Sequence, residues 1–217
     1  MTADRIFEGK PVLEFDTGSS RRKFLKMAGL VGVGATFVAG GAVLTAPTAM
    51  ADAKMATGTK GDLDILNYAL TLEYLEADYY AKGLAAGVLS GRELELITPI
   101  SDHEKTHVSA VTDAVKAFGG TPVSKPKITY PAGAFDTRES FLKNAAMFEE
   151  LGVKAYHGQV TLISSGDVLA SAAAIAGVES RHAAILAQLT ATNPFPAPVE
   201  GTLSMDQVLA EVKPLIS

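Results

Sequence analysis

The chain has 217 residues, of which 47% are hydrophobic and 7% aromatic, and this length favours one domain with a sizeable core. It contains no cysteine, which excludes disulfides, thiolate zinc sites, haem-thiolate ligation and cysteine nucleophiles, so any bound metal must use histidine and carboxylate ligands. The formal net charge of -5 offers no basic surface for nucleic acid, and we expect no nucleic-acid partner.

Residues 1–51 have the three-part plan of an export signal. The stretch SRRKFLK at residues 20–26 is basic, residues 27–51 form an uncharged apolar run, and the run closes with the small-residue sequence AMA. Paired arginines followed by FLK and a glycine-rich apolar run resemble the bacterial twin-arginine signal. The resemblance implies export of a folded protein by the twin-arginine translocon, cleavage after Ala51, and a periplasmic or otherwise exported domain over residues 52–217.

Two other interpretations of this segment stay open. About 20 apolar residues suffice to span a bilayer, so the segment can also be an uncleaved membrane anchor. A cytoplasmic start that only looks like a signal is the second alternative. The glycines of the apolar run make a poor anchor helix, and we therefore expect no stable membrane association after cleavage.

From residue 62 onward, apolar residues recur with helical periodicity, and no stretch has the alternation of a strand. Pro99 predicts a kink or break in the second helix. Asp136 with Glu139 resembles a capping box at the start of the third, and Ser204 with Gln207 predicts a short C-terminal helix. The pattern predicts four long helices, from about Asp62 to Leu84, from about Ser90 to Phe118, from behind Asp136 to about Ser164, and from behind Asp167 to before Asn193.

The connections between these helices indicate their arrangement. Short connections join the first helix to the second and the third to the fourth, so each pair is expected to form an antiparallel hairpin. Residues 119–135, between the two hairpins, are long enough to cross the whole bundle. We therefore predict an all-α fold: an antiparallel four-helix bundle of two hairpins joined by one long crossover, with its core over about residues 60–191.

The helix faces expected to point at the bundle axis are mostly apolar, with acid or imidazole near the middle of each. Four carboxylates converging there would each cost several kcal/mol to bury unpaired. Two divalent ions would balance the four charges, and oxygen donors with imidazole suit iron or manganese, with zinc as an alternative. The polar residues on these faces are Glu73, Glu104 with His107, Glu149, and Glu179 with His182.

A glutamate from each of two helices plus Glu-x-x-His from each of the other two is the metal site of ferritin-like proteins. Over about residues 60–191 the chain resembles the ferritin-like superfamily, and the phrases LEYLEADYY, EELGVKAYHG and VESRHAAIL are similar to a bacterial group often labelled desiccation-associated. The resemblance implies iron storage or oxidation, reduction of peroxide or dioxygen, or manganese-dependent peroxide dismutation. Loss of Glu104 or Glu179 is expected to abolish one metal position.

The chain also looks like a duplicated hairpin. LEYLEADYY at residues 72–80 aligns without a gap on FEELGVKAY at residues 148–156, which places Glu73 on Glu149 and Tyr80 on Tyr156. Glu104 follows Glu73 by 31 residues, and Glu179 follows Glu149 by 30. This alignment favours Glu149 over the adjacent Glu150 as the ligand.

Residues 103–107 read HEKTH, the letters of a zinc-hydrolase signature in which His103 and His107 bind the metal and Glu104 polarises water. That interpretation leaves the repeated pair of Glu179 and His182 unexplained. We therefore expect only Glu104 and His107 to belong to the site, and His103 to be a solvated helix histidine.

Three further residues near the expected site need a role. Glu76 lies one helical turn from Glu73, and we expect it at the surface or behind the ligands. Tyr80 and Tyr156 are expected to be core tyrosines with satisfied hydroxyls. The alternative is that their phenols hydrogen-bond a metal ligand or carry a transient radical.

The leading hypothesis is an exported protein with a dinuclear iron or manganese site that reacts with peroxide or dioxygen in oxidative or desiccation stress. Its partners would then be metal ions and small oxygen species. A non-catalytic stress or structural bundle is the first alternative, and an iron-storage assembly, which needs a hollow multi-subunit shell, is the second. The sequence leaves open the metal, the catalytic activity and whether a homo-oligomer forms.

Overall fold

The computed structural model describes residues 60–216, so the expected signal peptide over residues 1–51 lies outside the described part. Within that part no strand forms, and one isolated antiparallel bridge joins Ile128 to Ile216. The all-α prediction is confirmed. The helices are α2 (Lys60–Ala86), α3 (Gly91–Ala117), α4 (Arg138–Gln159), α5 (Gly166–Leu189) and α6 (Met205–Val212).

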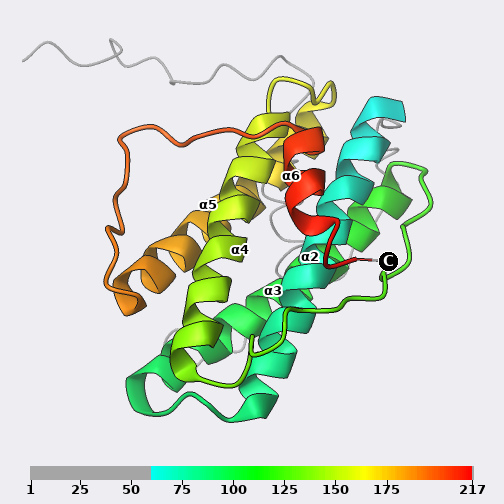
Figure 1. Cartoon of the computed structure of the whole chain (residues 1–217). Coiled ribbons are helices and arrows are strands. Elements are labelled where there is room, and N and C mark those ends of the chain that lie inside the picture. Colours follow the sequence, from blue (N-terminus) through cyan, green and yellow to red (C-terminus); the bar gives the residue numbers. More distant parts are fainter. Residues whose placement is uncertain (1–59, 217) are drawn as a thin grey trace, which may run out of the picture.

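The helices pair as predicted. α2 packs along α3 and α4 packs along α5, and the two hairpins meet through α2 against α4 and α3 against α5. Figure 1 shows the chain between α3 and α4 running along the bundle, and α6 lying against α4. The four-helix bundle of two hairpins, its crossover and its short C-terminal helix are therefore confirmed. None of the helices in residues 60–216 is long and apolar enough to cross a membrane.

Capping boxes begin α4 and α6, with one correction to the prediction at α4. Thr137, not Asp136, caps this helix: its side chain accepts from the backbone of Ser140, whose hydroxyl in turn accepts from the backbone of Thr137. Asp136 lies one residue too early because its backbone N–H closes a turn onto Gly133 at 3.2 Å. The predicted capping box of Ser204 and Gln207 at α6 is present.

Two predicted helix features differ from the structure. Of the kink or break expected at Pro99, the break is absent, because α3 continues through this residue from Gly91 to Ala117. An interior proline removes one hydrogen bond and crowds the carbonyl of the preceding turn, and the buried side chains of Ile97 and Ile100 hold the segment in the core on both sides. α4 ends at Gln159 rather than near Ser164, whose backbone N–H donates to Asp62 at 2.7 Å.

The apolar core forms two clusters, one towards each end of the bundle. The first is rich in aromatic rings, and Tyr79 stacks on Phe141 with 5.2 Å between ring centroids. The second is built on aliphatic residues such as Leu70, Val111 and Val115. Along each long helix, the glutamate of the expected site falls between residues of the two clusters, so the bundle buries its acids at mid-height.

A glycine on α4 lets the segment before α6 approach closely. A Cβ at Gly158 would lie 1.9 Å from the carbonyl oxygen of Leu203. Because backbone must move to relieve this clash, we expect Gly158→Ala to lower the free energy of unfolding by about 1–3 kcal/mol in urea denaturation. Gly177→Ala on α5 meets nothing within 4 Å and is the matched control. It should be neutral or stabilising by about 0.5–1 kcal/mol, and equal stability of the two variants would contradict the prediction.

Candidate metal centre

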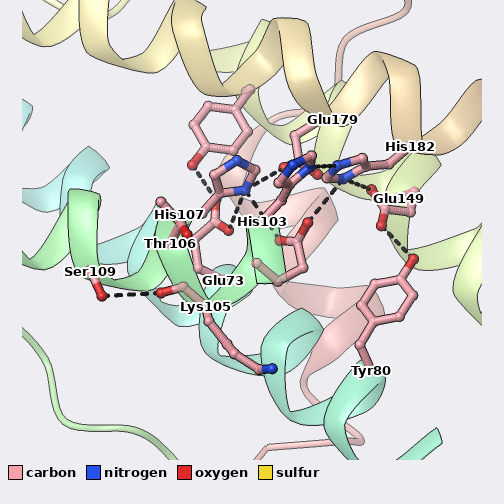
Figure 2. Close-up of polar contacts among 12 residues, drawn as sticks. Glu73, Tyr80, His103, Lys105, Thr106, His107, Ser109, Glu149, Glu179 and His182 are labelled. Carbon is pink, nitrogen blue, oxygen red and sulfur yellow. Dashed lines mark hydrogen bonds and ion pairs between the residues drawn. The ribbon is translucent and has the colours of Figure 1, made fainter. Parts of the chain in front are cut away.

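The six side chains expected at the bundle axis meet in one buried site. The four glutamates have no exposed surface, and each of the two histidines is 4% exposed. Each of the four long helices contributes, as Figure 2 shows for the residues it labels. The members are Glu73 of α2, Glu104 and His107 of α3, Glu149 of α4, and Glu179 and His182 of α5.

Their donor atoms form two neighbouring groups, within each of which the atoms lie within 4.8 Å of one another. Each group has one histidine and one glutamate of its own, Glu73 with His107 in the first and Glu149 with His182 in the second. Glu104 and Glu179 belong to both groups. Both of these glutamates therefore lie within reach of both groups.

Many donor atoms in this site make no hydrogen bond of good geometry within residues 60–216, although water cannot reach them. Apart from Oε2 of Glu179, they have only ion-pair contacts with one another, between the carboxylates and Nδ1 of His107 or His182. Buried polar atoms are normally satisfied, and leaving one unsatisfied costs about 1–3 kcal/mol. Here six such atoms are concentrated in one small volume, all able to present a lone pair. A pair of divalent cations fits this donor set, because carboxylate and imidazole are ligands of iron, manganese and zinc. The atoms are Oε2 of Glu73, Oε1 of Glu104, Oε2 of Glu149, both carboxylate oxygens of Glu179, and Nδ1 of His182.

Both imidazole rings turn the same nitrogen inward. Nδ1 of His107 lies 2.9 Å from Glu179 and 3.4 Å from Glu73. Nδ1 of His182 lies 3.0 Å from Glu104 and 3.3 Å from Glu149. The equivalent orientation of the two rings, each from a Glu-x-x-His pair, leaves Nδ1 as the atom available to a cation in both groups.

Burial and mutual repulsion perturb the carboxyl groups strongly. Burial raises the pKa of Glu73 to about 7, and burial together with the neighbouring glutamates raises the pKa of Glu179 well above its ordinary range. Burial acts on Glu104 in the same direction, but its contacts with His107 and His182 outweigh it and lower its pKa to about 2. Without bound cations, some of these buried carboxyl groups therefore keep protons that cations would replace.

The two tyrosines hydrogen-bond to the site across the bundle. Tyr80 of α2 donates its phenolic hydrogen to Oε1 of Glu149 on α4, at 2.5 Å (Figure 2), and Tyr156 of α4 donates to Glu73 of α2. Both rings are buried. The two hydrogen bonds are equivalent under the internal alignment of the two hairpins, since each tyrosine binds the glutamate of the opposite hairpin. Each phenol thereby fixes a carboxylate that belongs to only one of the two groups.

Glu76 lies inside the bundle rather than at the surface, with 3% of its surface exposed. Its carboxyl faces Gly152, where a Cβ would lie 3.0 Å from Oε1 of Glu76 and 3.3 Å from Oε2 of Glu179. Burial, then the surrounding glutamates, raises its pKa well above the ordinary range. Gly152 is also the position that aligns with Glu76 in the duplicated hairpin. The glycine of the second hairpin therefore leaves space for the carboxyl group of Glu76 from the first.

His103 is exposed, as expected, but it also contacts the site. Its Nδ1 lies 2.9 Å from Nε2 of His182. It joins neither group of converging donor atoms, so the two histidines of HEKTH do not form a shared zinc site in the described part of the chain. No feature of the sequence places His103 beside His182, because that contact depends on how α3 packs against α5.

Comparison with known families agrees with this architecture. The family model described as the ferritin-like domain matches residues 61–192, which is the whole of the bundle from α2 to the end of α5. No curated protein matches the chain.

Proposed function

Because the chain belongs to the ferritin-like domain family, we propose that it is a dinuclear metalloprotein that binds iron or manganese and uses it to react with peroxide or dioxygen. The observation that carries this proposal is the cluster of four buried glutamates and two histidines between the two apolar clusters, whose donor atoms lack hydrogen bonds of good geometry and converge in two groups. Purely structural bundles have no reason to concentrate four glutamates at mid-height, since an apolar core of the same volume is usually at least as stable.

The residues of the site have separable tasks in this proposal. Glu73 with His107, and Glu149 with His182, would hold one ion each, and Glu104 and Glu179 would be within reach of both. Bound iron or manganese would supply the valence change needed to reduce an oxygen species. Tyr80 and Tyr156 keep their glutamates oriented by donating hydrogen bonds. The surrounding apolar clusters exclude bulk water, which strengthens the electrostatic interactions inside the site.

Metal analysis followed by a peroxide assay tests this function. After loading with ferrous or manganous ion, the protein is expected to hold two ions per chain and to accelerate the disappearance of hydrogen peroxide over the metal-free protein. The metal content is measured by plasma mass spectrometry and the peroxide by its absorbance. A protein that takes up neither ion overturns the proposal. Uptake that raises stability without consuming peroxide or dioxygen favours the non-catalytic stress bundle instead.

We propose in addition that the domain is exported by the twin-arginine pathway, on the strength of the SRRKFLK stretch at residues 20–26. Replacement of Arg21 and Arg22 by lysine keeps the charge but removes the paired arginines that the pathway recognises. The variant is expected to accumulate uncleaved in the cytoplasmic fraction. The unaltered protein is expected in the periplasm as a cleaved chain that begins at Asp52. Immunoblotting of cell fractions measures the export, and equal export of the variant and the unaltered protein would contradict this proposal.

A further inference from the structure

His103 and His182 form a pair at the outer edge of the metal site. Nδ1 of His103 lies 2.9 Å from Nε2 of His182, and the two rings stack with 5.2 Å between centroids and 17° between planes. His103 is exposed on α3, whereas His182 on α5 is 4% exposed. Figure 2 shows the ring of His103 beside that of His182, with Glu149 on the other side of His182.

The orientation of the His182 ring decides which nitrogen needs a partner. Its Nδ1 points at Glu104 and Glu149, so Nδ1 is the atom to which a cation would bind. A neutral imidazole that binds a cation through Nδ1 carries its hydrogen on Nε2. Nδ1 of His103 is placed to accept that hydrogen, and an acceptor at this position fixes both the tautomer and the rotation of the ring.

Among residues 60–216, this contact exists on one side of the metal site only. When Glu104 is aligned on Glu179, His103 falls on Val178, which has no acceptor. Within residues 60–216, the hydrogen bond that the structure gives His107 uses Nδ1, the inward nitrogen, and not Nε2. The duplicated hairpins therefore provide matching ligands but an outer hydrogen bond to just one of the two histidines.

We propose that His103 is a positioning residue of the metal site: it accepts the Nε2 hydrogen of His182 and so makes the ion in the group of Glu149 and His182 the more tightly held of the two. The inference rests on the proposed function, since it assigns a role relative to bound metal. Its consequence is that the two ions leave and enter in a fixed order, with the ion beside His107 the more easily exchanged.

Cobaltous ion, a spectroscopic stand-in for ferrous ion, tests the order of binding in competition with a chromophoric chelator. His103→Val, which copies the residue of the other hairpin, is expected to weaken one of the two binding steps by about 10- to 100-fold and to leave the other unchanged. His103→Gln retains an acceptor and should stay within about threefold of the unaltered protein. His157→Val is the control, because His157 contacts the backbone of its own helix at Val153.

A second measurement does not depend on metal. In ¹⁵N-histidine-labelled apoprotein, nuclear magnetic resonance is expected to show a coupling across the hydrogen bond between Nε2 of His182 and Nδ1 of His103. Absence of that coupling overturns the role of His103 alone, as does equal weakening of cobalt binding by His103→Val and His103→Gln. Two unchanged binding steps in His103→Val overturn it as well. Failure of the unaltered protein to bind cobalt overturns both this inference and the proposed function.

Discussion

Replacing either shared glutamate by glutamine, as Glu104→Gln or Glu179→Gln, is expected to remove both bound ions from the protein. Both residues supply atoms to both groups, so each group loses a ligand and a negative charge at once. Glu73→Gln and Glu149→Gln should instead each remove one ion, because each residue belongs to a single group. Plasma mass spectrometry of protein loaded with manganous ion and passed through a desalting column measures the number retained.

Glu150→Gln is the matched control for this series. Glu150 adjoins Glu149 in sequence but is half-buried on the outside of α4, where it pairs with Lys154 at 3.0 Å. Its replacement is expected to leave two ions bound. Retention of one ion by Glu104→Gln would show that the shared arrangement is wrong and that each Glu-x-x-His pair serves its own position. Loss of an ion from Glu150→Gln would indicate that Glu150, and not Glu149, is the metal ligand.

The bundle could be predicted because its signals are local. Helical periodicity, short hairpin connections and the length of the crossover depend on residues near one another in the chain, and each agrees with the structure. Local signals also have limited resolution. The start of α4 differs by one residue because Thr137 and Asp136 are both good capping residues, and only the turn onto Gly133 distinguishes them.

Parts of the site depend on packing between helices, and these could not be predicted. The convergence of Glu73 and Glu149 follows from the duplicated hairpin, which the sequence alignment contains. The burial of Glu76 depends on its facing Gly152 across the bundle, and a pairwise alignment of the hairpins does not show which aligned positions touch. The contact of His103 with His182 requires the separation and rotation of α3 against α5, which no single helix specifies.

Raising the pH from about 5 to about 9 is expected to lower the stability of the metal-free protein. The pKa of Glu73 is about 7 in the folded protein against an ordinary 4.5, and that of His182 is about 9 against 6.5. Burial raises the pKa of Glu73. Burial lowers the pKa of His182, but its contacts with Glu104 and Glu149 outweigh this effect and raise it. A group whose pKa is higher in the folded state binds more protons there, so its contribution declines as the pH rises.

The pH windows of the two groups differ. The stability that Glu73 contributes is complete below about pH 4.5 and is lost as the pH rises through about 7. The contribution of His182 is complete below about pH 6.5 and is lost through about pH 9. Thermal unfolding followed by circular dichroism should therefore show a metal-free melting temperature that falls across this range. A melting temperature that rises with pH would contradict the assigned directions.

Bound metal should oppose this dependence on pH, because cations and protons compete for the same donor atoms. Binding to deprotonated ligands strengthens as the pH rises, so the difference in melting temperature between loaded and metal-free protein is expected to widen from pH 5 to pH 9. At a free ion concentration of about 100 times Kd, one ion adds about 2.7 kcal/mol, or roughly 5–10 °C for a domain of this size. Glu179→Gln should lose this response while Glu150→Gln keeps it, which ties the stabilisation to the shared carboxylate rather than to acidic residues on the surface.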